Sequence, residues 1–278
     1  GRYVTEKKIN VLEESIKLMN AMLDISQKQI ATGKTQLPTV YQLKAKLANT
    51  ETMLIHEKNL VRIFNIRLNY LMSREPDEPI SIDTNKVVKN YRSTGLFVRD
   101  TLQNRRSDIR RMNSIINSMK LNQTLTSLQK RPQLGIRYEQ FSQKSMPTNF
   151  QLMLQMRIPF VPWVSKQYKS EVKAMSYNIA AMEQEKQNSI NRASQTIKGL
   201  LVELESEYTE IDNYEKKVIP ANRKSVEVSL LSYGQNTNDI MMSLLAWDGL
   251  QMAQMEYLRH LETLLTIQTE YEKELEIR

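Results

Sequence analysis

The sequence predicts a mainly α-helical protein, with long antiparallel coiled-coil hairpins in two repeats and one β-hairpin between them. Three observations predict this fold class. The chain has only 7 Gly and 8 Pro among 278 residues, so few residues break helices. Apolar residues recur at helical spacing over several long segments. A single stretch, residues 132–161, changes to the strict alternation that is typical of β-strands.

Composition narrows the classes of protein that fit. No run of about 18 apolar residues occurs, so we expect no transmembrane helix. The chain has no Cys, which excludes disulfides and thiolate metal sites. The net charge of +8 permits contact with nucleic acid, but positive residues cluster only at 105–106 and 110–111. No recognition motif accompanies them, so we interpret them as a solvated helix face and expect no nucleic-acid partner.

Residues 1–74 predict the first coiled-coil hairpin. Apolar residues follow helical spacing up to about Ala31 and again from Val40 to Leu71. Gly33 and Pro38 separate these two helices, and the prolines at 76 and 79 end the second. At the usual rise per residue each helix is roughly 40–55 Å long. That length is too great for a compact bundle and suits an extended coiled coil.

Residues 75–131 predict a linker followed by a helix. Residues 80–94 lack a periodic pattern, and helical spacing returns between Phe97 and Met119. We therefore expect a helix over about 95–130.

Residues 132–161 predict a β-hairpin with a polar turn at 142–149. Alternate residues of the second strand place apolar side chains on one face, namely Phe150, Leu152, Leu154, Met156 and Ile158. A strand of about nine residues is long enough to cross a bilayer at a tilt. A soluble sheet with one wet face is the alternative. No other strand pattern occurs in the sequence, and two strands alone are marginal in water, so we expect partner strands from other chains.

Residues 162–278 predict the second coiled-coil hairpin. Helical spacing runs from about Lys166 to Val218, and Pro220 is expected to kink or restart the helix. Turn-forming residues at 234–239 then precede a long returning helix.

The two coiled-coil hairpins look like copies of one unit. Placing Gly33 on Gly234 aligns them, and each returning helix carries one His, at 56 and 260. Only 32 residues precede Gly33, whereas about 74 separate Phe160 from Gly234. If the repeats are equivalent, we expect the first to be N-terminally incomplete and the chain to be part of a longer protein.

Four motifs resemble those of TolC-like outer-membrane efflux proteins. In chain order they are LQNRRSDI at Leu102–Ile109, PQLGI at Pro132–Ile136, IPF at Ile158–Phe160, and the segment Val218–Gly234 with Thr237. Arg106 stands where this family usually has proline, and Tyr233 directly precedes Gly234, which departs from the family's spacing. In this order, and together with the repeat, the motifs extend the resemblance over nearly the whole chain.

The resemblance implies an assembly and a role. It implies a homotrimer in the bacterial outer membrane, in which the β-hairpin joins a shared β-barrel and its apolar face contacts lipid. The helices then form a tunnel through the periplasm, and the helix within 75–131 is the equatorial helix. Such proteins are passive exit ducts of tripartite efflux or type I secretion systems. They receive substrates from an inner-membrane pump through a periplasmic adaptor protein.

The resemblance also implies a docking site at the two helix reversals. These tips would meet the adaptor, and the predicted docking residues are Gly33, Lys34, Thr35, Tyr233, Gly234, Gln235, Asn236 and Thr237. Glycine fits the left-handed position that often ends a helix, so simple turns are the alternative interpretation. A tunnel constriction is assigned to Asp239, Ile240 and Ser243, although Asp239 also suits a helix N-cap.

We expect no metal site, no cofactor and no enzymatic activity. Met252 and Met255 share a helix face, and their thioether sulfurs would suit a soft metal ion such as Cu(I). Packing along a helix seam is the better explanation for these methionines. The two histidines are interpreted as surface or seam residues. No catalytic triad, phosphate-binding loop or carboxylate pair is evident. The alternative function is a soluble coiled-coil scaffold or a nucleic-acid-associated rod, and the exported substrate stays open.

Overall fold

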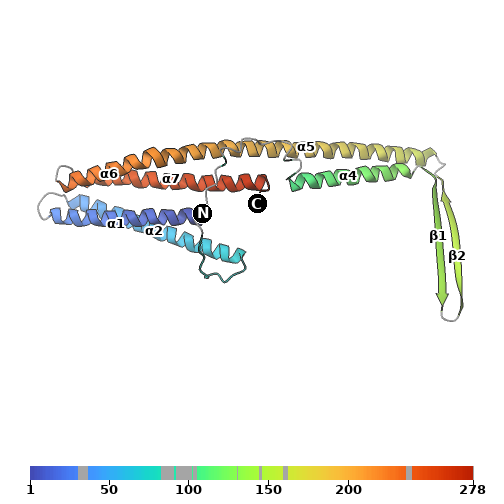
Figure 1. Cartoon of the computed structure of the whole chain (residues 1–278), viewed down its shortest axis with the longest axis horizontal. Coiled ribbons are helices and arrows are strands. Elements are labelled where there is room, and N and C mark those ends of the chain that lie inside the picture. The colour runs from blue at the N-terminus through green and yellow to red at the C-terminus, as the bar shows by residue number, and fades with distance from the viewer. Residues whose placement is uncertain are drawn as a thin grey trace. The chain divides into compact units, whose positions relative to one another are not determined.

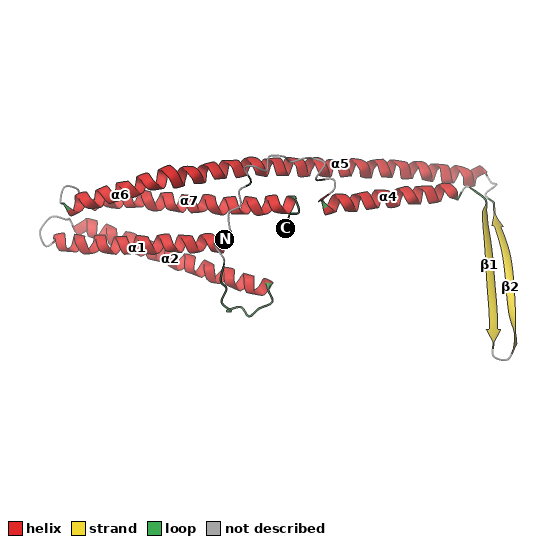
Figure 2. Ribbon diagram, in the orientation of Figure 1, coloured by secondary structure: helices red, strands yellow, loops and turns green. Residues whose placement is uncertain are grey.

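The computed structural model describes residues 1–30, 37–82, 91, 102, 105–129, 131–143, 146–158, 162–235 and 240–277. Long helices dominate these residues, and one β-hairpin is present (Figures 1 and 2). In chain order the elements are α1 (Arg2–Ile30), α2 (Leu37–Leu71), α4 (Ser107–Leu128), β1 (Gln133–Gln143), β2 (Met146–Arg157), α5 (Pro162–Asn213), η1 (Tyr214–Val218), α6 (Ile219–Gly234) and α7 (Ile240–Glu274).

The chain divides into two compact units. Unit 1 comprises residues 1–95 and 198–273, and unit 2 comprises residues 96–197 and 274–278. The mainly helical fold with a single β-hairpin, predicted from the sequence, is confirmed for the described residues.

Buried residues on the long helices follow the three-four spacing of coiled coils. On α5 they include Ile190, Ala193, Ile197, Leu200, Leu204, Tyr208 and Ile211. On α7 they include Ile240, Leu244, Trp247, Gln251, Leu258, Leu261, Leu264 and Gln268. This spacing keeps one seam of each helix against its neighbours, which is how long helices bury apolar surface without a compact core.

The end of α2 is fixed by hydrogen bonds to Asn69, which is fully buried. Its Nδ2 donates to the carbonyl oxygens of Pro76 at 3.0 Å and Glu78 at 2.8 Å. The N–H of Arg74 donates to the Asn69 carbonyl at 2.9 Å. The chain therefore turns back immediately after α2, where the two prolines were predicted to end the helix.

Tyr91 is anchored on α5 and α7 within unit 1. Its N–H donates to the Tyr208 hydroxyl at 3.2 Å, and Gln268 Nε2 donates to the same hydroxyl at 2.7 Å. The Tyr91 hydroxyl donates to Glu272, and its ring lies 5.2 Å from that of Tyr271. Burial, and then the bond to Glu272, raises the pKa of Tyr91. The phenol therefore stays protonated and continues to donate this hydrogen bond.

The expected kink at Pro220 takes the form of a π-helical turn, η1, between α5 and α6. The N–H of Ile219 donates to the Tyr214 carbonyl, five residues back instead of four. Proline has no N–H, and its ring collides with the carbonyl four residues earlier in a regular α-helix. The wider turn relieves that collision while the helix continues.

The helix predicted over about 95–130 needs a correction in unit 2. Arg106 has an extended backbone, with φ −67° and ψ 126°, and α4 begins only at Ser107. Leu102 and Arg105 are helical, whereas residues 95–101 and 103–104 lie outside the described part of the chain. The observed φ lies within the range of proline, which the resemblance gives as the usual residue at this position.

An acidic cluster fixes the start of α4. Arg106 binds Asp108 at 2.9 Å and Glu274 at 2.6 Å, and Glu276 accepts from the N–H of Ser107 at 3.0 Å. Hydrogen bonding to Arg106 lowers the pKa of Asp108, and hydrogen bonds from Ser107 lower that of Glu276. These local contacts compete with continuation of the helix through Arg106, and apolar spacing gives no sign of them.

The β-hairpin is longer than predicted. Strands β1 and β2 pair antiparallel with Leu134 opposite Met156 and Ile136 opposite Leu154, and Gln143 still pairs with Met146. The predicted turn at 142–149 is therefore wrong, because backbone pairing continues where side-chain alternation has ended. Of the predicted lipid-facing residues, Phe150, Leu152, Leu154 and Met156 lie on β2 and are exposed. Ile158 follows the strand and is partly buried.

Among the described residues, no helix is both long and apolar enough to span a bilayer.

Candidate functional site

The candidate site is formed by the helix ends next to the two reversals. In the first hairpin α1 ends at Ile30 and α2 begins at Leu37, and in the second α6 ends at Gly234 and α7 begins at Ile240 (Figure 1). Several predicted residues lie outside the described part of the chain, namely Gly33, Lys34, Thr35, Asn236, Thr237 and Asp239. Tyr233, Gly234, Gln235, Ile240 and Ser243 are described.

One hydrophobic cluster joins the ends of both hairpins. It takes residues from α1, α2, α6 and α7, namely Met19, Met22, Leu43, Val226, Tyr233, Ile240, Leu244 and Trp247. Next to it, Lys46 Nζ of α2 lies 2.6 Å from Asp248 Oδ1 of α7 and 5.8 Å from the Trp247 ring centre. The two tips therefore form one packed body, and we name it the tip core.

Tyr233 belongs to the interior of the tip core, with only 3% of its surface exposed. Its hydroxyl lies 3.3 Å from Ser26 Oγ, which itself donates to the Met22 carbonyl at 2.7 Å. Because the single Ser26 hydrogen is used in that bond, the Tyr233 hydroxyl is the donor in the first. Tyr233 thus connects α6 to α1, and its side chain is enclosed within this chain.

Gly234 does not adopt the left-handed conformation that the sequence predicts. It is the last residue of α6, and Gln235 closes the helix with φ −87° and an N–H bond to the Leu231 carbonyl at 3.1 Å. A Cβ at Gly234 would meet nothing within 4 Å. The sequence predicts that Gly234 follows the end of the helix, whereas in the structure it is the last helical residue. Gln235 takes the capping position after it.

Ile240 and Ser243, assigned to a tunnel constriction, both face the interior of unit 1. Ile240 is 1% exposed and Ser243 is 0% exposed. Neither side chain is accessible in this structure, because both follow the buried seam of α7. Of the three predicted residues only Asp239 is left for that role, and it lies outside the described residues.

Exposed apolar side chains lie on the same helix ends as the tip core, and the sequence did not predict them. They are Ile25 of α1, Leu37 and Tyr41 of α2, Leu231 of α6, and Met242 and Leu245 of α7. We name them the tip collar. A sequence signal for part of it exists, since Met242 and Leu245 fall outside the seam spacing that contains Leu244 and Trp247. Apolar residues beyond the seam indicate a second contact surface.

The two histidines differ in environment. His56 is exposed on α2, whereas His260 is buried in the seam of α7. The seam interpretation of His260 therefore agrees with the structure.

Comparisons with known proteins support the fold. No protein-family model matches the sequence, and no curated protein matches it. The solved structures that match 99% of the chain include the outer membrane protein VceC from Vibrio cholerae, at 13% identity and TM-score 0.79. They also include CusC, at 12% identity and TM-score 0.81, and the outer-membrane channel OprN, at 11% identity and TM-score 0.80. The chain spans 67%, 65% and 63% of their respective lengths. The fold predicted from the TolC-like resemblance is thus confirmed.

Proposed function

We propose that this chain, which has the fold of outer-membrane efflux channels, is a channel subunit that carries substrates across the bacterial outer membrane. The observation that carries the proposal is the structural match to channel proteins over 99% of the chain. A channel of this kind acts by enclosing a path, so the role needs neither a cofactor nor catalytic residues. Composition and periodicity predict the long helices, whereas the structural match supports the channel.

The β-hairpin supports the membrane part of the proposal. One face carries exposed apolar side chains from both strands, namely Leu134, Ile136, Tyr138, Phe150, Leu152, Leu154 and Met156. Polar side chains such as Arg137, Glu139, Gln151 and Gln155 occupy the other face. In the described residues the sheet has only these two strands, so the outer edge of each strand has no hydrogen-bonded neighbouring strand. Hairpins from a homotrimer would close the edges and place the apolar face against lipid.

The tip collar supports a docking role for the hairpin tips. Its exposed apolar side chains lie on the same helix ends as a tip core that is already packed, so a partner would meet a preformed surface. We propose that a periplasmic adaptor binds here through helices and links the channel to an inner-membrane pump. The docking residues predicted at 33–35 and 233–237 belong to the same two helix reversals. Efflux and type I secretion both fit this arrangement.

The test is fractionation of the natural gene product expressed from its own gene. We expect it in the outer membrane, as a trimer that dissociates on heating in a denaturing gel. The trimer and the membrane location both follow from hairpins that share one barrel. Recovery as a freely soluble monomer or dimer would contradict the proposal and favour a coiled-coil scaffold.

A further inference from the structure

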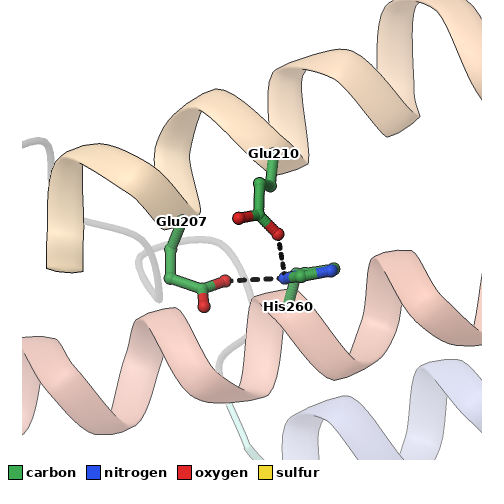
Figure 3. Close-up of side chains that lie close together, drawn as sticks. All are labelled: Glu207, Glu210 and His260. Carbon is green, nitrogen blue, oxygen red and sulfur yellow. Dashed lines mark hydrogen bonds and ion pairs between the residues drawn. The ribbon is translucent and has the colours of Figure 1, made fainter.

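Two carboxylates converge on His260 across the seam between α5 and α7 in unit 1. Glu207 and Glu210 are three positions apart on α5, so they lie on one face of that helix. Figure 3 shows both carboxylates directed at the same ring nitrogen. His260 Nδ1 lies 2.9 Å from Glu207 Oε2 and 3.0 Å from Glu210 Oε2. His260 and Glu207 are largely enclosed, with side chains 8% and 16% exposed, whereas that of Glu210 is 46% exposed.

The other ring nitrogen of His260 identifies the tautomer. His260 Nε2 lies 3.1 Å from Arg259 Nη2, and a guanidinium group can only donate hydrogen bonds. Nε2 must therefore accept, and Nδ1 carries the hydrogen of a neutral ring. That one hydrogen faces two carboxylate oxygens. The ring therefore supplies one N–H donor for two carboxylate acceptors.

We propose that Glu207, Glu210 and His260 bind one divalent transition-metal ion of the Zn²⁺ class. Imidazole nitrogen and carboxylate oxygen are ligands for such ions, and three protein ligands with one open position make a familiar Zn²⁺ arrangement. The three ligand atoms lie within 4.8 Å of one another. Nδ1–oxygen separations of 2.9 and 3.0 Å are slightly shorter than the roughly 3.3 Å between ligands of a tetrahedral ion with bonds near 2.0–2.1 Å. Small side-chain movements complete the geometry.

The ion would replace a shared hydrogen by a double positive charge. When Nδ1 binds metal, its hydrogen moves to Nε2, so the neutral ring stays neutral and no net proton is released. Both carboxylates then bind the ion directly. Since the acids come from α5 and the imidazole from α7, the ion connects two helices of the second hairpin. This site is independent of the proposed channel function.

Arg259 opposes the ion in the present arrangement. A hydrogen on Nε2 would face the guanidinium group, and the positive charge repels a cation. Arg259 can turn away, because its side chain is 59% exposed and its Nε already donates to Glu256 at 2.7 Å. Metal binding therefore requires Arg259 to leave Nε2. Removal of this side chain is expected to strengthen binding, which a simple ion pair among these residues does not predict.

The test is titration of the purified, chelator-treated 278-residue chain with Co²⁺, followed by competition with Zn²⁺. We expect one equivalent of Co²⁺, with the intense visible absorption of a four-coordinate ion, and its displacement by Zn²⁺. Zn²⁺ should raise the melting temperature, because it binds the folded chain. His260→Asn and Glu210→Gln should each weaken binding at least about tenfold, and Arg259→Gln should strengthen it about tenfold, in line with the size of effects around metal ligands.

His56→Asn is the matched control, because it removes the only other histidine and should leave binding unchanged. Glu210→Gln keeps the test decisive if His260→Asn fails to fold, since Glu210 is partly exposed. Circular dichroism verifies the fold of each variant. Absence of the Co²⁺ absorption, equal loss in His56→Asn, or unchanged binding in a folded Glu210→Gln variant would each overturn the proposal.

Discussion

Tyr233 shows at the scale of one residue how the tips are joined. Its hydroxyl donates to Ser26, which donates in turn to the Met22 carbonyl. The sequence placed Tyr233 next to a helix reversal but gave no reason to bury it. A phenol adjacent to a turn is compatible with either exposure or burial, and only packing against the other hairpin decides between them.

Tyr233→Phe should destabilise the chain by about 1 kcal/mol, because one buried hydrogen bond is lost while the ring keeps its packing. Urea unfolding followed by circular dichroism measures the effect. Ser26→Ala should cost a similar amount, and the double variant should cost less than the two together, because both remove the same bond. Strictly additive losses would show that the two hydroxyls do not interact.

Two glycines provide a second residue-scale prediction. Gly234→Ala should stabilise the chain by about 0.4–1 kcal/mol, since the helical backbone and open space accept a methyl group. Gly249→Ala should destabilise it by about 1 kcal/mol or more, because the new Cβ would lie 2.8 Å from Asn222 Oδ1. Asn222 is held in place by its bond to the Val218 carbonyl. Equal effects of both variants in urea unfolding would contradict the close approach of α6 and α7 at Gly249.

At the scale of elements, the correct predictions were those that rest on the spacing of apolar residues. Helical spacing located the long helices, and alternation located the hairpin, because each pattern follows directly from the backbone repeat. The predicted start of α4 and the predicted length of the β-turn were wrong, since both depend on hydrogen bonds that apolar spacing does not record. The cluster of Glu207, Glu210 and His260 was not predicted for a related reason, because these side chains meet only when α5 and α7 pack together.

The start of α4 gives a prediction with a defined pH dependence. Arg106→Gln should destabilise the chain by about 1 kcal/mol at pH 7, because bonds to Asp108 and Glu274 are lost from partly buried positions. The folded pKa of Asp108 lies below its unfolded value, so its contribution is present above about pH 4 and is lost as pH falls further.

The difference in stability between wild type and Arg106→Gln should therefore shrink below about pH 4 in urea unfolding. Arg110→Gln, which changes an exposed arginine of the same helix, is the control and should have little effect. A difference that grows as the pH falls would contradict the assigned ion pairs.

At the scale of the whole molecule, the proposed docking of an adaptor at the tip collar gives a testable prediction. Leu231→Asp and Met242→Lys should each weaken adaptor binding at least about tenfold, because a charge would be buried in an apolar contact. Met252→Lys is the matched control, since Met252 is also exposed on α7 but lies further along the helix from the tip. Surface plasmon resonance against the purified adaptor measures affinity. Equal weakening by all three variants would contradict docking at the tips.

The most direct test of the channel proposal concerns the two faces of the β-hairpin. The chain has no cysteine, so single cysteines report on one position at a time. Leu154→Cys lies on the apolar face, and Gln155→Cys is its neighbour on the polar face. In isolated outer membranes we predict that a water-soluble maleimide labels Gln155→Cys and not Leu154→Cys, which instead reacts with a lipid-soluble maleimide. Equal labelling of both cysteines by the water-soluble reagent would contradict a lipid-facing strand and the channel account with it.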